Sequence, residues 1–212
     1  MTRIKISSYN SSFLKKLFDY LLGFILFSIS LPLTAFIWLL MLFLDSGPVI
    51  FRQKRVGKGG KVFTVYKFRT MRKGAERQRD RLLKLNEVDG PVFKIYNDPR
   101  YTKIGKILAH TGLDELPQLL NVLKGEMSLV GPRPFPIYEA ELLSMREKVR
   151  QLVKPGITSS WIISGSHQLK FNEWMQLDKE YVLKATLGQD ISILLKTGLI
   201  ILKSSLNQVR KA

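Results

Sequence analysis

The sequence YLLGFILFSISLPLTAFIWLLMLFL, from Tyr20 to Leu44, contains no charged residue and is dense in leucine, isoleucine and phenylalanine. An apolar stretch of about 20 residues is long enough to cross the hydrocarbon core of a bilayer as a helix. The run is too long for the apolar part of a secretory signal, and no small-residue cleavage pattern follows it. We therefore expect a membrane helix that persists in the mature protein. A buried helix of a soluble core is seldom apolar on every face.

The surroundings of this run argue against a simple span. Basic residues stand on both sides of it: Lys15, Lys16, Arg52, Lys54 and Arg55. A single span normally has its basic excess on one side only, so both ends should prefer the cytoplasm. Pro32 lies near the middle, where it removes a backbone donor and bends a helix, and Ser28 or Ser30 could satisfy the freed backbone groups. We favour a re-entrant hairpin of two half-helices in one leaflet over a kinked full span.

The composition restricts the partners of the protein. Its 212 residues suffice for one domain with a hydrophobic core and one attached element. With 34 Lys and Arg against 17 Asp and Glu, the formal charge is +17. This charge favours partners that carry phosphate: nucleic acid, anionic membrane lipid or a phosphorylated substrate. We do not expect a nucleic-acid binder, because the basic residues are dispersed and no stacking-plus-basic motif is present.

Residue types that bind soft metals are scarce. The absence of cysteine excludes disulfides, thiolate nucleophiles and cysteine-based zinc sites. His110 and His167 are the only histidines, which argues against a histidine-rich metal site. If a metal takes part, oxygen ligands are expected, and the ion is then Mg²⁺ or Mn²⁺.

The remainder of the chain predicts short strands and helices. Residues 49–55 and 62–68 have the pattern of two strands joined by a plain turn at Gly57-Lys58-Gly59-Gly60. Helical patterns follow at residues 75–87, 113–124 and 191–206. The last of these is amphipathic, and either docking at the membrane interface or burial in the core would suit it.

These elements predict an α+β fold in two parts. Residues 1–46 form a basic N-terminus and the membrane hairpin. Residues 47–212 form a compact, helix-rich cytoplasmic domain with a small β-hairpin or sheet, attached also through interfacial amphipathic helices.

Asp114-Glu115 is the best candidate for chemistry. The pair stands at the expected start of the helix at residues 113–124, where the helix dipole and unpaired backbone donors keep a carboxylate ionised. Consecutive side chains on a helix diverge, so a division of labour is expected: one carboxylate attacks phosphorus and the other helps to hold Mg²⁺. An Asp-Glu pair at a helix start is more often only a cap.

Basic residues elsewhere in the sequence favour a phosphate-binding site near these carboxylates. Gly131-Pro132-Arg133-Pro134 places a guanidinium in a rigid, proline-framed turn, which suits a diphosphate. Lys67, Arg69 and Arg100 supply further cations near turns or strand ends, although each alone is usually a solvated surface group.

Several segments together closely resemble the bacterial sugar transferase family, the monotopic polyprenyl-phosphate phosphoglycosyl transferases. In chain order they are residues 47–53 (GPVIFRQ), 67–71 (KFRTM), 98–100 (DPR), 113–119 (LDELPQL), 125–134 (GEMSLVGPRP), 154–158 (KPGIT), and Leu177-Asp178 with Tyr181. The resemblance covers nearly the whole chain. Larger relatives carry extra spanning helices before this region, and we expect the minimal form without them.

The resemblance implies a transferase that moves a sugar 1-phosphate from a nucleotide sugar, usually a UDP-sugar, to polyprenyl (undecaprenyl) phosphate. The reaction takes place at the cytoplasmic face of the bacterial inner membrane and starts a surface glycan, such as an exopolysaccharide or lipopolysaccharide. In that scheme Asp114 attacks the sugar-proximal phosphate, UMP leaves, and polyprenyl phosphate then takes the phosphosugar. Glu115 binds Mg²⁺ or aids the second step. The implied substrate-binding residues are Arg133, Lys67, Arg69, Arg100 and Asp178, and Pro32 and Ser30 mark the membrane kink. A homo-oligomer remains an open option.

The chain departs from the family pattern where substrates would bind. Before Asp114 the family usually shows a basic residue followed by Ser or Thr, whereas residues 109–112 here read AHTG. After residue 158, relatives commonly continue with glycine and later a Gly-Arg pair, whereas this chain has Ser159-Ser160 and then Gly165-Ser166-His167. Either His110, His167 or nearby lysines compensate, or the donor differs, or activity is reduced. The alternative function is a divergent, weakly active or inactive member that serves as a membrane scaffold or partner.

Overall fold

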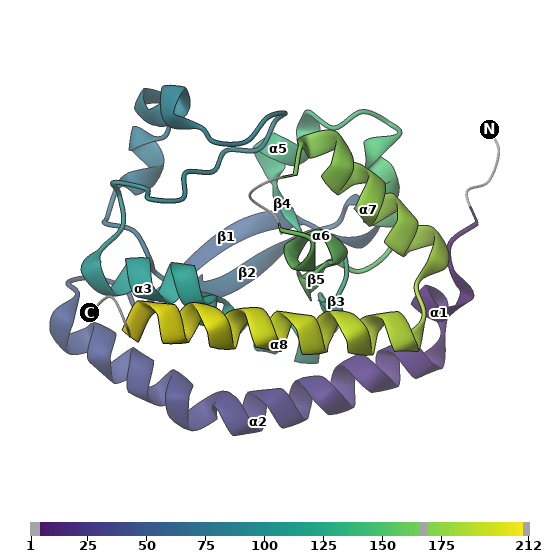
Figure 1. Ribbon diagram of the computed structural model, residues 1–212, viewed down its shortest axis with the longest axis horizontal. Helices are drawn as coiled ribbons and strands as arrows, with labels where there is room; N and C mark the ends of the chain where they lie inside the picture. The colour runs from purple at the N-terminus through teal and green to yellow at the C-terminus, as the bar shows by residue number, and fades with distance from the viewer. Residues whose placement is uncertain (1–4, 166–168, 210–212) are drawn as a thin grey trace.

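The computed structural model describes residues 5–165 and 169–209 and consists of helices around two small sheets (Figure 1). The α-helices are α1 (Ser8–Ser11), α2 (Phe13–Leu44), α3 (Lys103–Thr111), α4 (Leu119–Leu123), α5 (Ile137–Glu141), α6 (Ser160–Ile163), α7 (Phe171–Lys184) and α8 (Leu187–Val209). The 3₁₀ helices are η1 (Lys58–Gly60), η2 (Ala75–Gln78), η3 (Asp80–Leu85), η4 (Leu113–Gln118) and η5 (Glu147–Leu152). The strands are β1 (Ile50–Val56), β2 (Val62–Phe68), β3 (Ser128–Val130), β4 (Phe135–Pro136) and β5 (Gly156–Thr158). This is an α+β architecture, as expected.

The predicted hairpin is confirmed. β1 and β2 are antiparallel, in register from Ile50 opposite Phe68 to Val56 opposite Val62. Their turn needs glycine, because Gly59 has a φ of +66°, which side chains disfavour. β4 pairs with the other edge of β1, which gives the order β2-β1-β4, and β3 and β5 form a separate parallel pair.

The membrane segment is one helix. The two expected half-helices are not separate, because α2 continues from Phe13 to Leu44 with Pro32 inside it, whereas the expected bend is present (Figure 1). Figure 1 shows that α2 bends near its middle and that both its ends rise toward the sheets. Proline removes one backbone hydrogen bond, which a long helix tolerates by bending. The Ser30 hydroxyl donates to the Phe27 carbonyl at 3.1 Å, so it bonds within the turn before Pro32.

Both ends of α2 pack on the folded body, while its middle is exposed. Lys15 and Asp19 are buried near one end, and Ile37 and Met41 are buried near the other. Only 11% of its most apolar 18-residue window is buried, so α2 is not a core helix. Within the described part of the chain, it is the one helix whose length and composition would let it cross a membrane. Whether it spans the bilayer or re-enters it stays a prediction.

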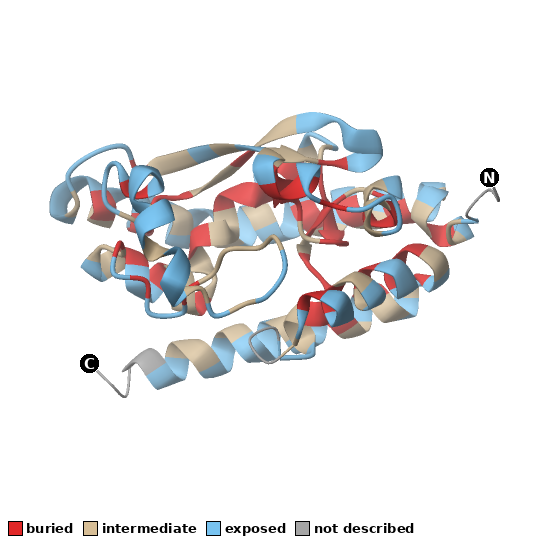
Figure 2. Ribbon diagram, turned by 90° about the horizontal axis from the view of Figure 1, so that it is seen from above, coloured by how far each residue is buried: buried red, intermediate tan, exposed pale blue. Residues whose placement is uncertain are grey.

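α8 lies on the same side of the sheets as α2 (Figure 1). Its first turns are anchored by Asp190 and Ile193, both of which are buried. Residues 194–207 contain no buried residue, and Figure 2 shows exposed and intermediate colours toward the C-terminus. Of the two expected alternatives for this helix, burial in the core therefore describes only the beginning of α8. The exposed leucines Leu195 and Leu199 are compatible with interfacial docking, which stays a prediction.

Residues 75–87 differ from the expected single helix. They form η2 and η3, with Arg79 between them. Among the residues of η2 and η3 only Ala75 is buried. The narrow apolar side of this segment thus has little to pack against, and tertiary packing supplies most of the stability of a helix in a protein.

A buried amide attaches α4 to the hairpin. The Asn121 side chain is fully buried, and its Nδ2 donates to the Thr64 carbonyl and to Glu126 Oε2, both at 2.7 Å. The Tyr66 backbone N–H donates to Asn121 Oδ1 at 3.3 Å. Because η4 directly precedes α4, these bonds also fix η4 against β2.

Candidate active site

A cavity of about 1440 Å³ lies between the body of the protein, α2 and α8. Part of its wall is apolar and comes from the two helices: Leu22, Leu26, Ile29, Leu195 and Ile200. Another part is charged and comes from the hairpin, η4 and two loops: Arg55, Lys67, Lys94, Asp114, Glu115 and Arg133. The cavity therefore suits a ligand with an apolar part and an anionic part.

The segment that carries Asp114 and Glu115 starts at a sharp turn. Gly112 ends α3 with a φ of +74°, the left-handed conformation in which glycine commonly ends a helix. The expected helix at residues 113–124 follows, but its first six residues are the 3₁₀ helix η4 and only Leu119–Leu123 are α-helical. Gly112 has no side chain to cap η4, and the Glu115 N–H donates instead to the Gly112 carbonyl at 3.2 Å.

Glu115 is paired with Arg133, as Arg133 Nη2 donates to Glu115 Oε1 at 2.5 Å. Burial alone would raise the pKa of Glu115, but the Arg133 guanidinium, with Lys67 and Arg55, outweighs burial and lowers that pKa below its ordinary value. Glu115 is therefore a stable anion whose direction is set by a charge-assisted hydrogen bond.

Asp114 behaves differently from the expectation. It is buried in the cavity wall, and its carboxylate forms no ion pair with any residue that the structure describes. Burial, and then the negative charge of Glu115, raise the pKa of Asp114 to about 7, although Lys67 and Arg133 act in the opposite direction. The expected depression of this pKa by a helix dipole is wrong, because a six-residue 3₁₀ helix has a small dipole and desolvation is larger.

Two cations of the site were not anticipated. Arg55, on β1, donates to the Pro134 carbonyl at 2.6 Å and to Gln53 Oε1, and burial lowers its pKa to about 10. Lys94 lies in the loop before α3, and burial lowers its pKa to about 8. The alternation of Gln53 and Arg55 along one strand face could have indicated Arg55. The irregular loop around Lys94 has no periodicity that would indicate its direction.

The expected cations Lys67, Arg69 and Arg100 have three different surroundings. Lys67 lines the cavity, and burial lowers its pKa. Arg100 also lines it, but its guanidinium is bound to Asp98 at 2.6 and 2.9 Å and to the Ala75 carbonyl. Arg69 is outside the lining and lies 3.3 Å from Asp45. The geometry thus brings Lys67 and Arg133 to the carboxylates, and it does not bring Arg69 there.

Asp178 is also outside the cavity lining, yet it is connected to Arg133. It is fully buried on α7 and lies 2.8 Å from Arg150 Nη2. The same guanidinium donates to the Arg133 carbonyl at 2.7 Å. Asp178 thus supports the backbone of the arginine turn through Arg150, and its expected contact with substrate stays a prediction.

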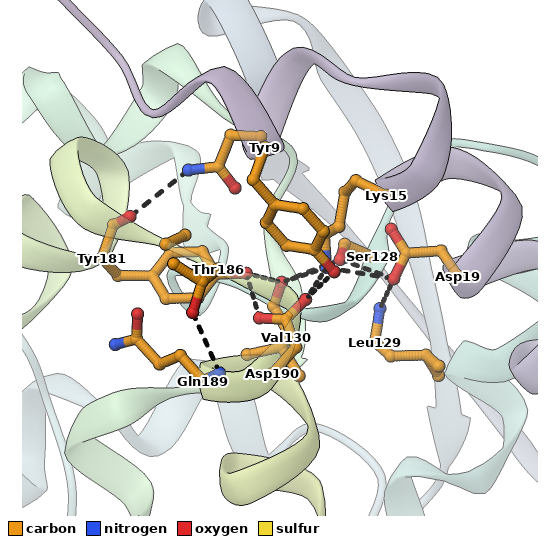
Figure 3. A network of polar contacts seen from close by, with 12 residues as sticks. Tyr9, Lys15, Asp19, Ser128, Leu129, Val130, Tyr181, Thr186, Gln189 and Asp190 are labelled. Atoms are coloured by element: carbon orange, nitrogen blue, oxygen red, sulfur yellow. Dashed lines mark hydrogen bonds and ion pairs between the residues drawn. The ribbon is translucent and has the colours of Figure 1, made fainter.

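A buried polar network connects α2 to the strand that precedes Arg133 (Figure 3). The Lys15 ammonium donates to Asp190 Oδ2 at 2.6 Å, to Asp19 Oδ1 at 3.1 Å and to the Val130 carbonyl at 3.2 Å. Asp19 Oδ1 in turn accepts a hydrogen bond from the Leu129 backbone N–H at 3.1 Å. All three donors of one ammonium are used, so the start of α2, the start of α8 and β3 are joined at one point.

The residues that differ from the family pattern are only partly described. Ala109 lines the cavity with a methyl group. His110 stacks on Tyr96 with ring centroids 4.5 Å apart, and its Nε2 lies 2.9 Å from the Tyr96 carbonyl. Ser166 and His167 lie outside the described residues.

Asp114 and Glu115 are the carboxylates of the cavity that could bind a divalent cation such as Mg²⁺. Among the described residues, no group of three or more His, Cys, Asp or Glu side chains could hold a metal ion. Mg²⁺ is commonly bound by only one or two protein carboxylates together with substrate phosphates and water. Asp114 and the second carboxylate oxygen of Glu115, which Arg133 does not contact, could provide these one or two ligands.

The fold and the site define an α+β protein in which a long apolar helix and a group of carboxylates and cations line one cavity. The chain belongs to the bacterial sugar transferase family, whose family model matches residues 10–204.

Several curated proteins are similar to it. The galactosyl transferase CpsE of Streptococcus agalactiae is 47% identical over 74% of this chain and 35% of its own length. The undecaprenyl-phosphate galactose phosphotransferase of Salmonella typhimurium is 39% identical over 92% of this chain and 41% of its own length. The exopolysaccharide production protein ExoY of Rhizobium meliloti is 36% identical over 86% of this chain and 83% of its own length. The chain thus spans less than half of the first two relatives and most of ExoY.

Proposed function

We propose that this chain is a phosphoglycosyl transferase, which moves a sugar 1-phosphate from a UDP-sugar to polyprenyl (undecaprenyl) phosphate and releases UMP. The observation that carries the proposal is the unpaired Asp114 carboxylate in the wall of a cavity that is cationic in one part and apolar in another. The name of the Salmonella relative, an undecaprenyl-phosphate galactose phosphotransferase, supports the transfer of a sugar phosphate to undecaprenyl phosphate. The place of action is the cytoplasmic face of the bacterial inner membrane, where a surface glycan begins.

The two carboxylates take different roles in the reaction. An oxygen of ionised Asp114 attacks the sugar-proximal phosphorus, and the bond from that phosphorus to the bridging oxygen breaks, so UMP leaves with the electron pair. An oxygen of polyprenyl phosphate then attacks the phosphorus carried by Asp114, and the carboxylate departs. Glu115, paired with Arg133, is the poorer nucleophile because its charge is already engaged.

A divalent cation and the lipid each have a place in this scheme. Glu115 would hold Mg²⁺ or Mn²⁺, which when bound neutralises charge on the phosphates. The apolar wall from α2 and α8 would accommodate the start of the prenyl chain, so that its phosphate lies near Asp114. A shallow anchor helix then serves catalysis by holding the carboxylate at the depth of the lipid phosphate.

The test is release of UMP by the protein in lipid nanodiscs with Mg²⁺, across a panel of UDP-sugars. Asp114→Asn should abolish release and also abolish labelling of the protein by a donor whose sugar-proximal phosphorus is radioactive. Glu141→Gln, at an exposed carboxylate outside the cavity, is the matched control and should react as the wild type does. Equal release by Asp114→Asn would refute the mechanism. Absence of release and of labelling with every donor would favour the scaffold alternative.

A further inference from the structure

We propose that Lys94 binds the diphosphate of the nucleotide donor and, together with Lys67, supplies the positive charge that Arg133 has already committed to Glu115. This inference rests on the proposed nucleotide-sugar donor and adds a residue to its binding site. It also changes the role of Arg133 from the main phosphate ligand to the partner that directs Glu115.

The argument begins with the cations of the cavity wall. Arg133 is paired with Glu115, and Arg100 is paired with Asp98. Arg55 uses its donors on the Pro134 carbonyl and the Gln53 side chain. These three guanidinium groups are therefore engaged within the protein. The other two arginines of the wall lie over aromatic rings: Arg52 is 5.9 Å from the centroid of the Tyr66 ring, and Arg79 is 4.2 Å from that of Tyr138.

Two of the three lysines of the wall, Lys67 and Lys94, are not engaged in this way, and the third, Lys54, is exposed on β1. Across residues 5–165 and 169–207, the Nζ atoms of Lys67 and Lys94 form neither a hydrogen bond nor an ion pair, and Lys67 lies only over the Phe51 ring, 5.5 Å from its centroid. Lys67 and Lys94 are half-buried, and an ammonium that is partly removed from water without an anion carries a desolvation penalty. That penalty is the main cause of the lowered pKa of Lys94, and an anionic ligand would remove it.

The backbone of Lys94 is fixed, so its side chain starts from a defined point. Its N–H donates to Asn86 Oδ1 at 2.8 Å, and its carbonyl accepts from the Glu87 N–H at 2.9 Å. The neighbouring Phe93 N–H donates to Glu139 Oε1 at 3.4 Å. Preorganisation of this kind reduces the entropy that a ligand contact costs.

The loop that carries Lys94 also packs against α3, which contributes no cation to the cavity lining. Tyr96 stacks on His110, and the Tyr96 carbonyl lies 2.9 Å from His110 Nε2. His110 is therefore occupied by the loop, and the adjacent Ala109 offers only a methyl group to the cavity. The loop thus brings an ammonium to the site from the side where α3 contributes none.

The test compares Lys94→Met, which keeps the length of the chain, with Lys94→Arg, which keeps the charge. Full-length protein in nanodiscs is titrated calorimetrically with UDP and, separately, with uridine. Lys94→Met should weaken UDP binding about tenfold or more, the size expected for a lost charge-assisted hydrogen bond. Lys94→Arg should restore most of the affinity, and uridine binding should be the same in all variants. The control Lys84→Met, at an exposed lysine of η3 outside the cavity, should bind UDP as the wild type does.

The outcomes separate this inference from the proposed function. UDP binding that depends on Lys94 would support the inference even if no UMP were ever released. Unchanged UDP affinity in Lys94→Met would overturn it even if the enzyme turned over normally, and so would failure of the wild type to bind UDP. An equal loss of uridine and UDP binding, or a loss that arginine does not rescue, would indicate a structural role and would also overturn it. In turnover, the effect should fall on KM for the donor more than on kcat.

Discussion

The Lys15 ammonium lies 2.6 Å from Asp190 Oδ2, so the beginning of the anchor helix and the beginning of α8 are joined by a buried ion pair. The Tyr9 hydroxyl donates to the same Asp190 oxygen at 2.9 Å, and the Tyr181 hydroxyl lies 2.8 Å from the other one. The network also reaches β3, which leads directly into the turn of Arg133. α2 is therefore attached to the turn of Arg133 through polar contacts as well as by apolar packing.

Removing this cation should destabilise the protein strongly. Lys15→Met leaves Asp19 and Asp190 buried without a positive partner, and breaking a buried ion pair from one side costs about 3 to 5 kcal/mol. Thermal or denaturant unfolding in detergent would measure the loss. Lys16→Met, at the exposed neighbouring lysine, should leave the free energy of unfolding nearly unchanged. Equal stability of the two variants would show that the network contributes little.

Glu115 and Arg133 should act as one unit in catalysis. Glu115→Gln and Arg133→Met should each reduce kcat/KM for UMP release, because each removes one half of the charge-assisted pair. The double variant should lose less than the sum of the two single losses, with a coupling of about 1 to 3 kcal/mol. Strictly additive losses would mean that the two residues serve the reaction independently.

Stability should increase as the pH falls from about 7 to about 5. Burial raises the pKa of Asp178 to about 6 and also raises that of Glu139. A raised folded-state pKa contributes stability that is fully present below the unfolded value near 4 and is lost as pH rises through the folded value. For Asp178 this amounts to about 3 kcal/mol. Glu115, whose pKa is lowered, acts in the opposite direction.

The measurement is the thermal unfolding midpoint across that pH range. Asp178→Asn should weaken the dependence, because one of the groups that take up a proton is gone, while Asp114 and Glu139, whose pKa values burial also raises, remain. A midpoint that falls steadily from pH 7 to pH 5 would contradict the assignment of buried carboxyls with raised pKa values.

Removing divalent cations should stop turnover but hardly affect folding. We expect EDTA to abolish UMP release and Mg²⁺ to restore it, because the ion is needed on the donor phosphates. The unfolding midpoint should stay nearly constant, since the described residues provide no group of three or more ligands that would form a protein cage. A large drop in the midpoint with EDTA would reveal a structural metal site instead.

Gly105 should tolerate no side chain. A Cβ at this position of α3 would lie 2.0 Å from the Thr70 carbonyl oxygen, which is backbone and cannot turn away. Gly105→Ala should therefore cost about 3 kcal/mol or more, despite the better helix propensity of alanine. Gly188→Ala, where nothing lies within 4 Å, is the matched control and should be neutral or stabilising. Comparable unfolding midpoints for both variants would contradict this contact.

Short-range patterns predicted much of the fold. The alternation along residues 62–68 gave the strand β2, and the uncharged run gave the anchor helix, because each pattern concerns neighbours in the chain. The same reasoning predicted one helix for residues 75–87, which is wrong, because this segment has little to pack against and the local pattern does not contain packing. The bend of α2 was expected from Pro32, but its two halves form one continuous helix (Figure 1).

The site was predicted in part for the same reason. Asp114, Glu115, Lys67 and Arg133 were identified from sequence, and the structure brings them into one cavity wall. Lys94 was missed because an irregular loop gives little indication of where a long side chain points. Arg55 was missed although its alternation with Gln53 on one face of β1 could have indicated it. Arg69 lies elsewhere, paired with Asp45.

The sequence by itself determined the apolar helix, the hairpin and the acidic pair at the start of η4, since these depend on residue types within a few positions of one another. Only the tertiary structure decided which charges meet. Glu115 is engaged by Arg133, Asp114 is left unpaired with a pKa raised by burial to about 7, and Lys15 is placed against Asp190. Electrostatic energies depend on distance and desolvation in space, and separation along the chain contains neither.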